Sequence, residues 1–69
     1  MTALINSDTW KVIRTTDEQH IGERIESVVV GETIVFNDGD RVFVENIIID
    51  DDGKLIAFNS NYQITLVKE

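Results

Sequence analysis

Short runs of β-branched and aromatic residues alternate with turn residues along most of this chain. The runs are GETIVF at 31–36, RVFVENIII at 41–49, KLIAF at 54–58 and YQITL at 62–66. Such runs are typical of strands on a pleated, half-buried surface. The segments between them carry Asp-Gly or clustered Asn and Ser, which favour tight turns, at 37–40, 50–53 and 59–61. The pattern therefore predicts an antiparallel meander.

The spacing of apolar residues predicts which side chains face the core. Tyr62, Ile64 and Leu66 share one face of the last run, because successive side chains of a strand alternate. In the run 41–49 the polar pair Glu45–Asn46 shifts the phase, and a β-bulge there would bend the strand as a small barrel requires. The bulge would place four side chains on one face: Val42, Val44, Ile47 and Ile49.

The first third of the chain has two interpretations. WKVIRTT at 10–16 predicts a strand, and TDEQ at 16–19 matches a helix-capping box. We expect one short helical turn near residues 16–22, followed by a strand. The alternative is an α+β fold with a helix over 17–28, where apolar residues recur at helical spacing. Gly22 would lie inside that helix at a cost of about 1 kcal/mol relative to Ala.

Composition limits the class of protein. A chain of 69 residues predicts a single domain over 1–69, and its 42% hydrophobic content is too high for a disordered chain. The absence of cysteine excludes disulfides and thiolate metal sites. A chain this short buries only roughly 60% of its unfolded surface. Self-association is therefore one expected way to bury the β-branched runs VVV and III.

Charge narrows the expected partners. The net charge is −7, with six Lys and Arg against thirteen Asp and Glu. Nucleic-acid and membrane binding both depend on basic side chains, so neither is expected. No apolar run reaches the roughly 18 residues of a transmembrane helix. MTALINSDTW at 1–10 lacks the basic and apolar regions of a signal peptide. The expected location is therefore the cytoplasm.

The aspartates at 50–52 are the first candidate for chemistry. In a calcium-binding EF-hand loop aligned on Gly53, Ile48 would fall at a ligand position and the final glutamate would be missing. We therefore interpret the segment as a solvated hairpin tip, with cation binding by Asp50, Asp51 and Asp52 as the alternative. His20 is predicted to lie on the surface of a polar turn. No nucleophile motif or phosphate-binding loop accompanies it, so neither a cofactor nor enzymatic activity is expected.

Two aromatic residues are candidates for binding. Trp10, the only tryptophan, is predicted to close one end of the core, and the alternative is an exposed interface anchor. Tyr62 directly follows the turn at 59–61 and is the second candidate binding residue.

Residues 30–66 resemble the Src-homology-three (SH3-like) pattern. Gly31-Glu32-Thr33-Ile34 is similar to the family's first glycine-acidic turn, DDDG lies at the distal hairpin, and Ser60-Asn61-Tyr62 matches its S-N-Y letters. The resemblance implies a small barrel and a role for Tyr62 in a groove for proline-rich peptides. The family's N-terminal aromatics and its tryptophan are missing here, and Asn59 replaces its proline.

These observations predict an all-β domain, a five- to six-strand antiparallel SH3-like barrel with one helical turn. The expected function is a non-enzymatic interaction or assembly module that binds a protein partner or a second copy of itself. The alternative is an acidic decoy that blocks a basic site on a partner, a role that would suit a small viral protein.

Overall fold

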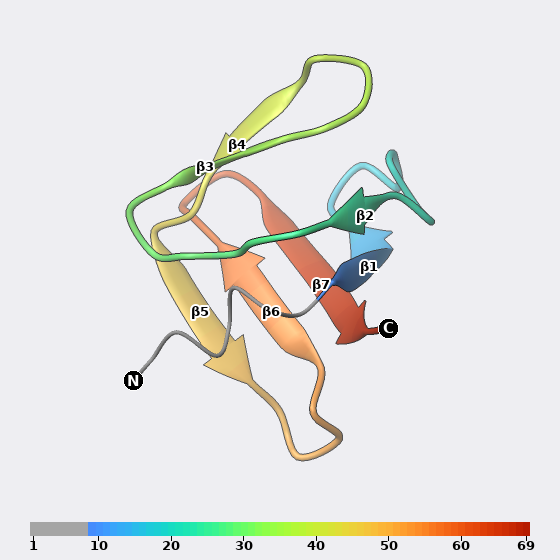
Figure 1. Cartoon of the computed structure of the whole chain (residues 1–69). Helices are drawn as coiled ribbons and strands as arrows, with labels where there is room; N and C mark the ends of the chain where they lie inside the picture. Colours follow the sequence, from blue (N-terminus) through green and yellow to red (C-terminus); the bar gives the residue numbers. More distant parts are fainter. Residues whose placement is uncertain (1–8) are drawn as a thin grey trace.

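The computed structural model describes residues 9–69, which form an all-β domain (Figure 1). A five-stranded antiparallel sheet has the strand order β2-β1-β7-β6-β5, and the hairpin β3–β4 forms a second, two-stranded sheet. No helix within this range has the length and apolarity needed to cross a bilayer. The strands are β1 Trp10–Thr15, β2 Arg24–Ile25, β3 Thr33–Val35, β4 Arg41–Phe43, β5 Asn46–Ile49, β6 Leu55–Phe58 and β7 Gln63–Lys68. The signal-peptide prediction concerns mostly residues 1–8, which lie outside the described range.

The predicted meander is confirmed over the C-terminal half. Strands β5, β6 and β7 pair antiparallel in sequence order, and β7 also pairs with β1. The three predicted turns connect β3 to β4, β5 to β6 and β6 to β7. Gly39 and Gly53 adopt φ of 93° and 82° in the first two turns. These left-handed conformations explain why glycine follows aspartate in both.

In place of the predicted β-bulge near Glu45–Asn46, the run 41–49 passes from one sheet to the other at this point. The N–H of Val44 donates to the carbonyl of Glu32 at 2.9 Å, whereas the next N–H, of Glu45, donates to the carbonyl of Phe58 at 3.1 Å. The chain therefore leaves the β3–β4 hairpin and joins β6 at this point. Val42 and Val44 are buried as predicted and Ile47 packs against the core. The prediction is wrong for Ile49, which is 57% exposed at the strand end.

The loop between β1 and β2 is not helical. Residues 16–22 form turns and bends, with positive φ at Glu18 (62°), His20 (68°) and Gly22 (92°). Repeated left-handed residues interrupt helical hydrogen bonding, so the short helical turn is not confirmed. The alternative helix over 17–28 is wrong, because Arg24–Ile25 is a strand that pairs with β1.

The core lies between the two sheets and includes Trp10, which is 5% exposed. Trp10 is therefore a core residue, as predicted, and the alternative of an exposed anchor is wrong. Ile64 and Leu66 are fully buried, and Tyr62 packs against the core in the same phase. The other buried apolar residues are Val12, Ile25, Val28, Ile34, Phe36, Val42, Val44, Leu55 and Ala57.

Candidate functional site

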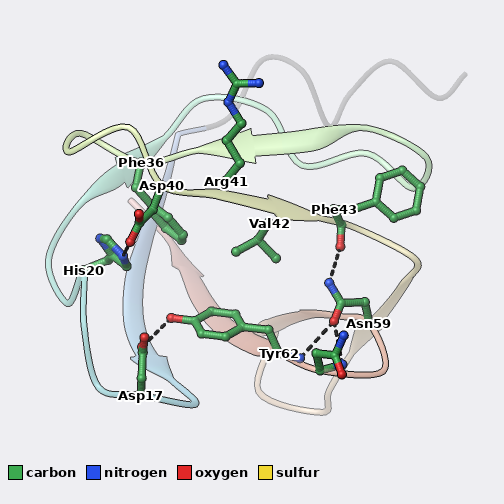
Figure 2. A pocket seen from close by; sticks show the side chains of 10 residues that line it. Asp17, His20, Phe36, Asp40, Arg41, Val42, Phe43, Asn59 and Tyr62 are labelled. Atoms are coloured by element: carbon green, nitrogen blue, oxygen red, sulfur yellow. Dashed lines mark hydrogen bonds and ion pairs between the residues drawn. The ribbon is translucent and has the colours of Figure 1, made fainter.

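Three loops converge on an open cleft of about 320 Å³ (Figure 2). The loop between β1 and β2 forms one wall, the β3–β4 hairpin the second, and the turn between β6 and β7 the third. The cleft thus lies where segments far apart in the sequence meet. Its lining residues are Asp17, His20, Phe36, Asp40, Arg41, Val42, Phe43, Asn59, Asn61 and Tyr62.

Tyr62 crosses from the β6–β7 turn toward the β1–β2 loop (Figure 2). Its hydroxyl donates to Oδ1 of Asp17 at 2.5 Å, and the same oxygen accepts the N–H of Gln19 at 3.1 Å. The hydrogen bond from Tyr62 holds the pKa of Asp17 below its usual range. Partial burial, followed by the bond to Asp17, raises the pKa of the Tyr62 phenol. The pair therefore places a neutral aromatic ring beside a fixed negative charge.

Asn59 ties the third wall of the cleft to the second. Its Oδ1 accepts the backbone N–H groups of Asn61 at 2.7 Å and Tyr62 at 2.9 Å, which closes the turn. Its Nδ2 donates to the carbonyl of Phe43 at 2.8 Å, at the end of β4. One amide side chain thus shapes the turn and fixes its position against the hairpin.

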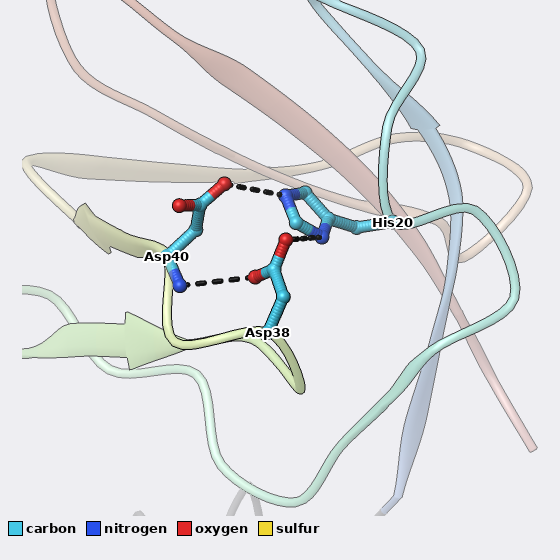
Figure 3. Close-up of side chains that lie close together, drawn as sticks. All are labelled: His20, Asp38 and Asp40. Atoms are coloured by element: carbon cyan, nitrogen blue, oxygen red, sulfur yellow. Dashed lines mark hydrogen bonds and ion pairs between the residues drawn. The ribbon is translucent and has the colours of Figure 1, made fainter.

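His20 lies at the opposite end of the cleft, close to Asp38 and Asp40 (Figure 3). Together with Glu23 these residues form what we call the His20 cluster. The His20 ring stacks on Phe36 with centroids 3.9 Å apart and an interplanar angle of 3°. Its side chain is only 5% exposed. The prediction of a surface histidine is therefore wrong: the ring is packed on a core aromatic residue.

Both ring nitrogens of His20 face carboxylates. Nδ1 is 3.0 Å from Oε2 of Glu23 and 3.9 Å from Oδ2 of Asp38, and Nε2 is 3.2 Å from Oδ2 of Asp40. Burial acts to lower the pKa of His20, but the bond to Glu23 and the charges of Asp38 and Glu23 outweigh it, so the pKa is raised. The cluster therefore stabilises positive charge on or beside the ring.

The carboxylates of the cluster are held by the backbone. Oε1 of Glu23 accepts the N–H of Asn37 at 2.8 Å, and its side chain is 17% exposed. Oδ1 of Asp38 accepts the N–H of Asp40 at 3.0 Å, which leaves Oδ2 facing the histidine. These bonds connect the β1–β2 loop to the tip of the β3–β4 hairpin.

Within residues 9–69, the possible metal-ligating atoms of His20, Asp38 and Asp40 lie within 4.8 Å of one another. The aspartates predicted as the alternative cation site, at 50–52, lie in the turn between β5 and β6. Oδ1 of Asp50 accepts the N–H groups of Asp52 and Lys54, both at 2.9 Å. This matches the interpretation of 50–53 as a hairpin tip.

The two predicted binding residues are not brought together, because Tyr62 lines the cleft whereas Trp10 is buried in the core. The sequence analysis gave no role to Phe43, predicted His20 as a surface residue, and assigned Asn59 only to a turn. Comparisons with models of protein families, with curated proteins and with solved structures gave no match. The assignment of function therefore depends on the geometry of the described residues.

Proposed function

We propose that this protein is a small, acidic, non-enzymatic interaction module and that the cleft binds a short segment of a partner protein. The observation that carries this proposal is the cleft itself, which combines apolar surface with a charged rim. Val42 forms part of its lining, Phe43 is 49% exposed beside it, and the ring of Tyr62 crosses it. Exposed aromatic surface of this kind is enriched at protein interfaces.

The rim indicates the chemistry of the partner. Asp17 keeps its charge through the bond from Tyr62, and Asp40 is 67% exposed at the other end. A segment with one apolar side chain against Val42 and Tyr62, and a Lys or Arg near Asp17 or Asp40, would complement both features. The acidity of the chain would also speed the approach of a basic partner.

We further propose that the two sheets are parts of one SH3-like barrel. Residues 24–35 contribute β2 to the five-stranded sheet and β3 to the hairpin, and residues 41–49 contribute β4 and β5 in the same way. Two bent segments shared by both sheets, together with the pairing of β1 with β7, support a closed arrangement.

A different protein is a better partner than a second copy of this chain. Strand β5 is one of the two edge strands of the five-stranded sheet, and its residues Ile48 and Ile49 are more than half exposed. Glu45 and Asp50 flank this strand, so antiparallel pairing of two copies centred on β5 would bring like charges together. The net charge of −7 per chain adds to the repulsion.

The acidic-decoy alternative gains no support from the arrangement of charge. A decoy needs its carboxylates on one face. The Asp38–Asp40 turn and the Asp50–Asp52 turn lie at opposite ends of the molecule in Figure 1. The carboxylates are therefore divided between separate surfaces.

A comparison of two exposed hairpin residues tests the proposal. Phe43→Ser removes an exposed aromatic side chain at the edge of the cleft, whereas Val35→Ser changes a 57% exposed residue of the same hairpin that does not line the cleft. Binding is measured by ¹⁵N chemical-shift perturbation with a pool of short peptides that combine basic and aromatic or aliphatic residues. We expect shifts at the cleft and an affinity loss of about tenfold for Phe43→Ser alone. Equal effects of the two substitutions, or shifts only outside the cleft, would contradict the proposal.

A further inference from the structure

The second ring nitrogen of His20 faces a carboxylate that cannot donate a hydrogen bond. A neutral imidazole carries one N–H, and Glu23, a carboxylate already fixed by Asn37, is placed to accept it from Nδ1 at 3.0 Å. Nε2 then presents a lone pair to Oδ2 of Asp40 at 3.2 Å. Two lone pairs at this distance repel each other unless a cation lies with them. That cation is either a second proton or a metal ion.

The distances around Nε2 suit a metal ion. Zinc lies about 2.1 Å from nitrogen and oxygen ligands, so two ligands of a tetrahedral ion are about 3.4 Å apart. The separation of 3.2 Å between Nε2 and Asp40 is close to this value. Asp38 offers an oxygen within 4.8 Å of a ring nitrogen of His20 and of an oxygen of Asp40, and its Oδ2 now lies 3.9 Å from Nδ1. Its side chain is 58% exposed, so a rotation about its own bonds can bring it nearer.

Glu23 completes the arrangement from the other side of the ring. Histidine ligands of metals generally donate their second ring N–H to a carboxylate, which fixes the tautomer and the ring orientation. Glu23 holds this place at Nδ1, and the stack on Phe36 fixes the plane of the ring. The ring is therefore oriented before any ion binds.

We propose that the side chains of His20, Asp38 and Asp40, which lie together in Figure 3, bind one divalent transition-metal ion. The ligands would be Nε2 and one oxygen of each carboxylate, with Asp38 turned from Nδ1 toward Nε2, and Glu23 would be the positioning residue at Nδ1. An imidazole with two carboxylates suits Zn²⁺ and, more weakly, Mn²⁺ in the usual order of stability of divalent ions. Mg²⁺ prefers oxygen ligands alone and a full octahedral shell, so it should bind weakly. The site lies across the β1–β2 loop and the β3–β4 hairpin, and it does not depend on the proposed binding of a peptide.

The single histidine of the chain makes the test direct. The full-length protein is titrated with ZnCl₂, and separately with MgCl₂, while the ring ¹H and ¹⁵N resonances of His20 are followed by NMR. Calorimetry gives the stoichiometry. We expect one Zn²⁺ per chain, a large shift of the Nε2 resonance, a retained Nδ1–H, and no comparable response to Mg²⁺.

Two aspartate substitutions of equal charge locate the ion. Asp40→Asn removes a proposed ligand at the tip of one hairpin, and Asp52→Asn changes a 76% exposed carboxylate at the tip of another. Loss of even an outer-shell partner costs about 10- to 100-fold in metal affinity. Asp40→Asn should therefore weaken Zn²⁺ binding at least about tenfold, and Asp52→Asn should leave it unchanged.

Three results would overturn the proposal. They are His20 resonances that respond to pH but not to millimolar Zn²⁺, equal Zn²⁺ affinities of the two aspartate variants, and a Zn²⁺-induced shift at Nδ1 in place of Nε2. The ¹⁵N–¹H spectrum of each variant shows whether the fold is intact. Both substitutions lie on exposed turns, so we expect it to be preserved.

Discussion

Replacement of Asn59 by alanine should destabilise the domain more than its half-buried position suggests. The substitution removes three side-chain hydrogen bonds, two within the turn and one to the carbonyl of Phe43. Each contributes a net 0.5–1.5 kcal/mol in typical proteins, and partial exposure favours the lower half of that range. We therefore expect a loss of about 2 kcal/mol. A chain of 69 residues has a total stability of roughly 3 to 10 kcal/mol, so this is a large fraction of it.

Urea denaturation followed by the fluorescence of Trp10, the only tryptophan, measures the loss. With a slope of about 1 kcal/mol per molar urea, the midpoint should fall by about 2 M. Asn59→Asp separates the two roles of the amide, because it keeps the acceptor for the turn but loses the donor to Phe43, so its cost should be intermediate. Asn61→Ala, at an exposed neighbour bonded through its backbone N–H, is the control. If Asn59→Ala and Asn61→Ala unfold at the same urea concentration, the side-chain hydrogen bonds of Asn59 do not stabilise the domain.

Three further predictions concern the core, the cleft and a turn. Leu66→Ala at a fully buried site should cost about 2–5 kcal/mol of unfolding free energy, whereas Ile48→Ala at a 52% exposed site should cost about 0.5 kcal/mol, by the same urea assay. Because folding lowers the pKa of Asp17 and raises that of Tyr62, their contributions should be lost as pH falls below about 4 and as it rises above about 10. Tyr62→Phe should weaken both pH dependences in thermal melts, and unchanged profiles would count against the Asp17 bond. Gly53→Ala should cost about 1 kcal/mol because φ is 82° there, and Gly53→Asn should recover part of this loss if strain is the cause.

Strands and turns could be predicted from the sequence because their signals are local. Alternation placed Tyr62, Ile64 and Leu66 on one face, and this face is the buried one. Ile49 followed the same logic and failed, because burial at a strand end depends on whether another element covers it. Alternation indicates the face of a strand, whereas tertiary contacts decide where the core ends.

The capping pattern at 16–19 misled the prediction for a related reason. Asp17 does accept a backbone N–H two residues later, from Gln19, as a cap would. The same oxygen also accepts from the hydroxyl of Thr15 and from that of Tyr62, which is 45 residues away in the sequence. Asp and Ser side chains favour turns as readily as helix starts. The bond from Tyr62 depends on tertiary structure, so a pattern of four neighbouring residues could not predict it.

The candidate site was harder to predict than the fold because each of its key side chains joins segments that are distant in the sequence. His20 and Asp40 are 20 residues apart, and Asn59 and Phe43 are 16 apart. A single histidine in a polar turn carries no sequence signal for a partner, and the aspartate pair at 38 and 40 reads as turn chemistry alone. Only the packing of the loops makes them one cluster.

The acidity of this chain therefore has two distinct roles. The sequence alone predicts that the thirteen Asp and Glu side chains lie on the solvated surface. Asp17 and Glu23 instead each accept bonds from a second loop or hairpin, from Tyr62 in one case and from Asn37 in the other. A chain without cysteine cannot fix its loops with disulfide bonds. Hydrogen bonds between the loops, such as those accepted by Asp17 and Glu23, hold the walls of the cleft in place instead. Asp50 to Asp52 make no such link to another loop, and for this reason charge changes there should affect solubility while equal changes at Asp17 or Glu23 should affect the shape of the cleft.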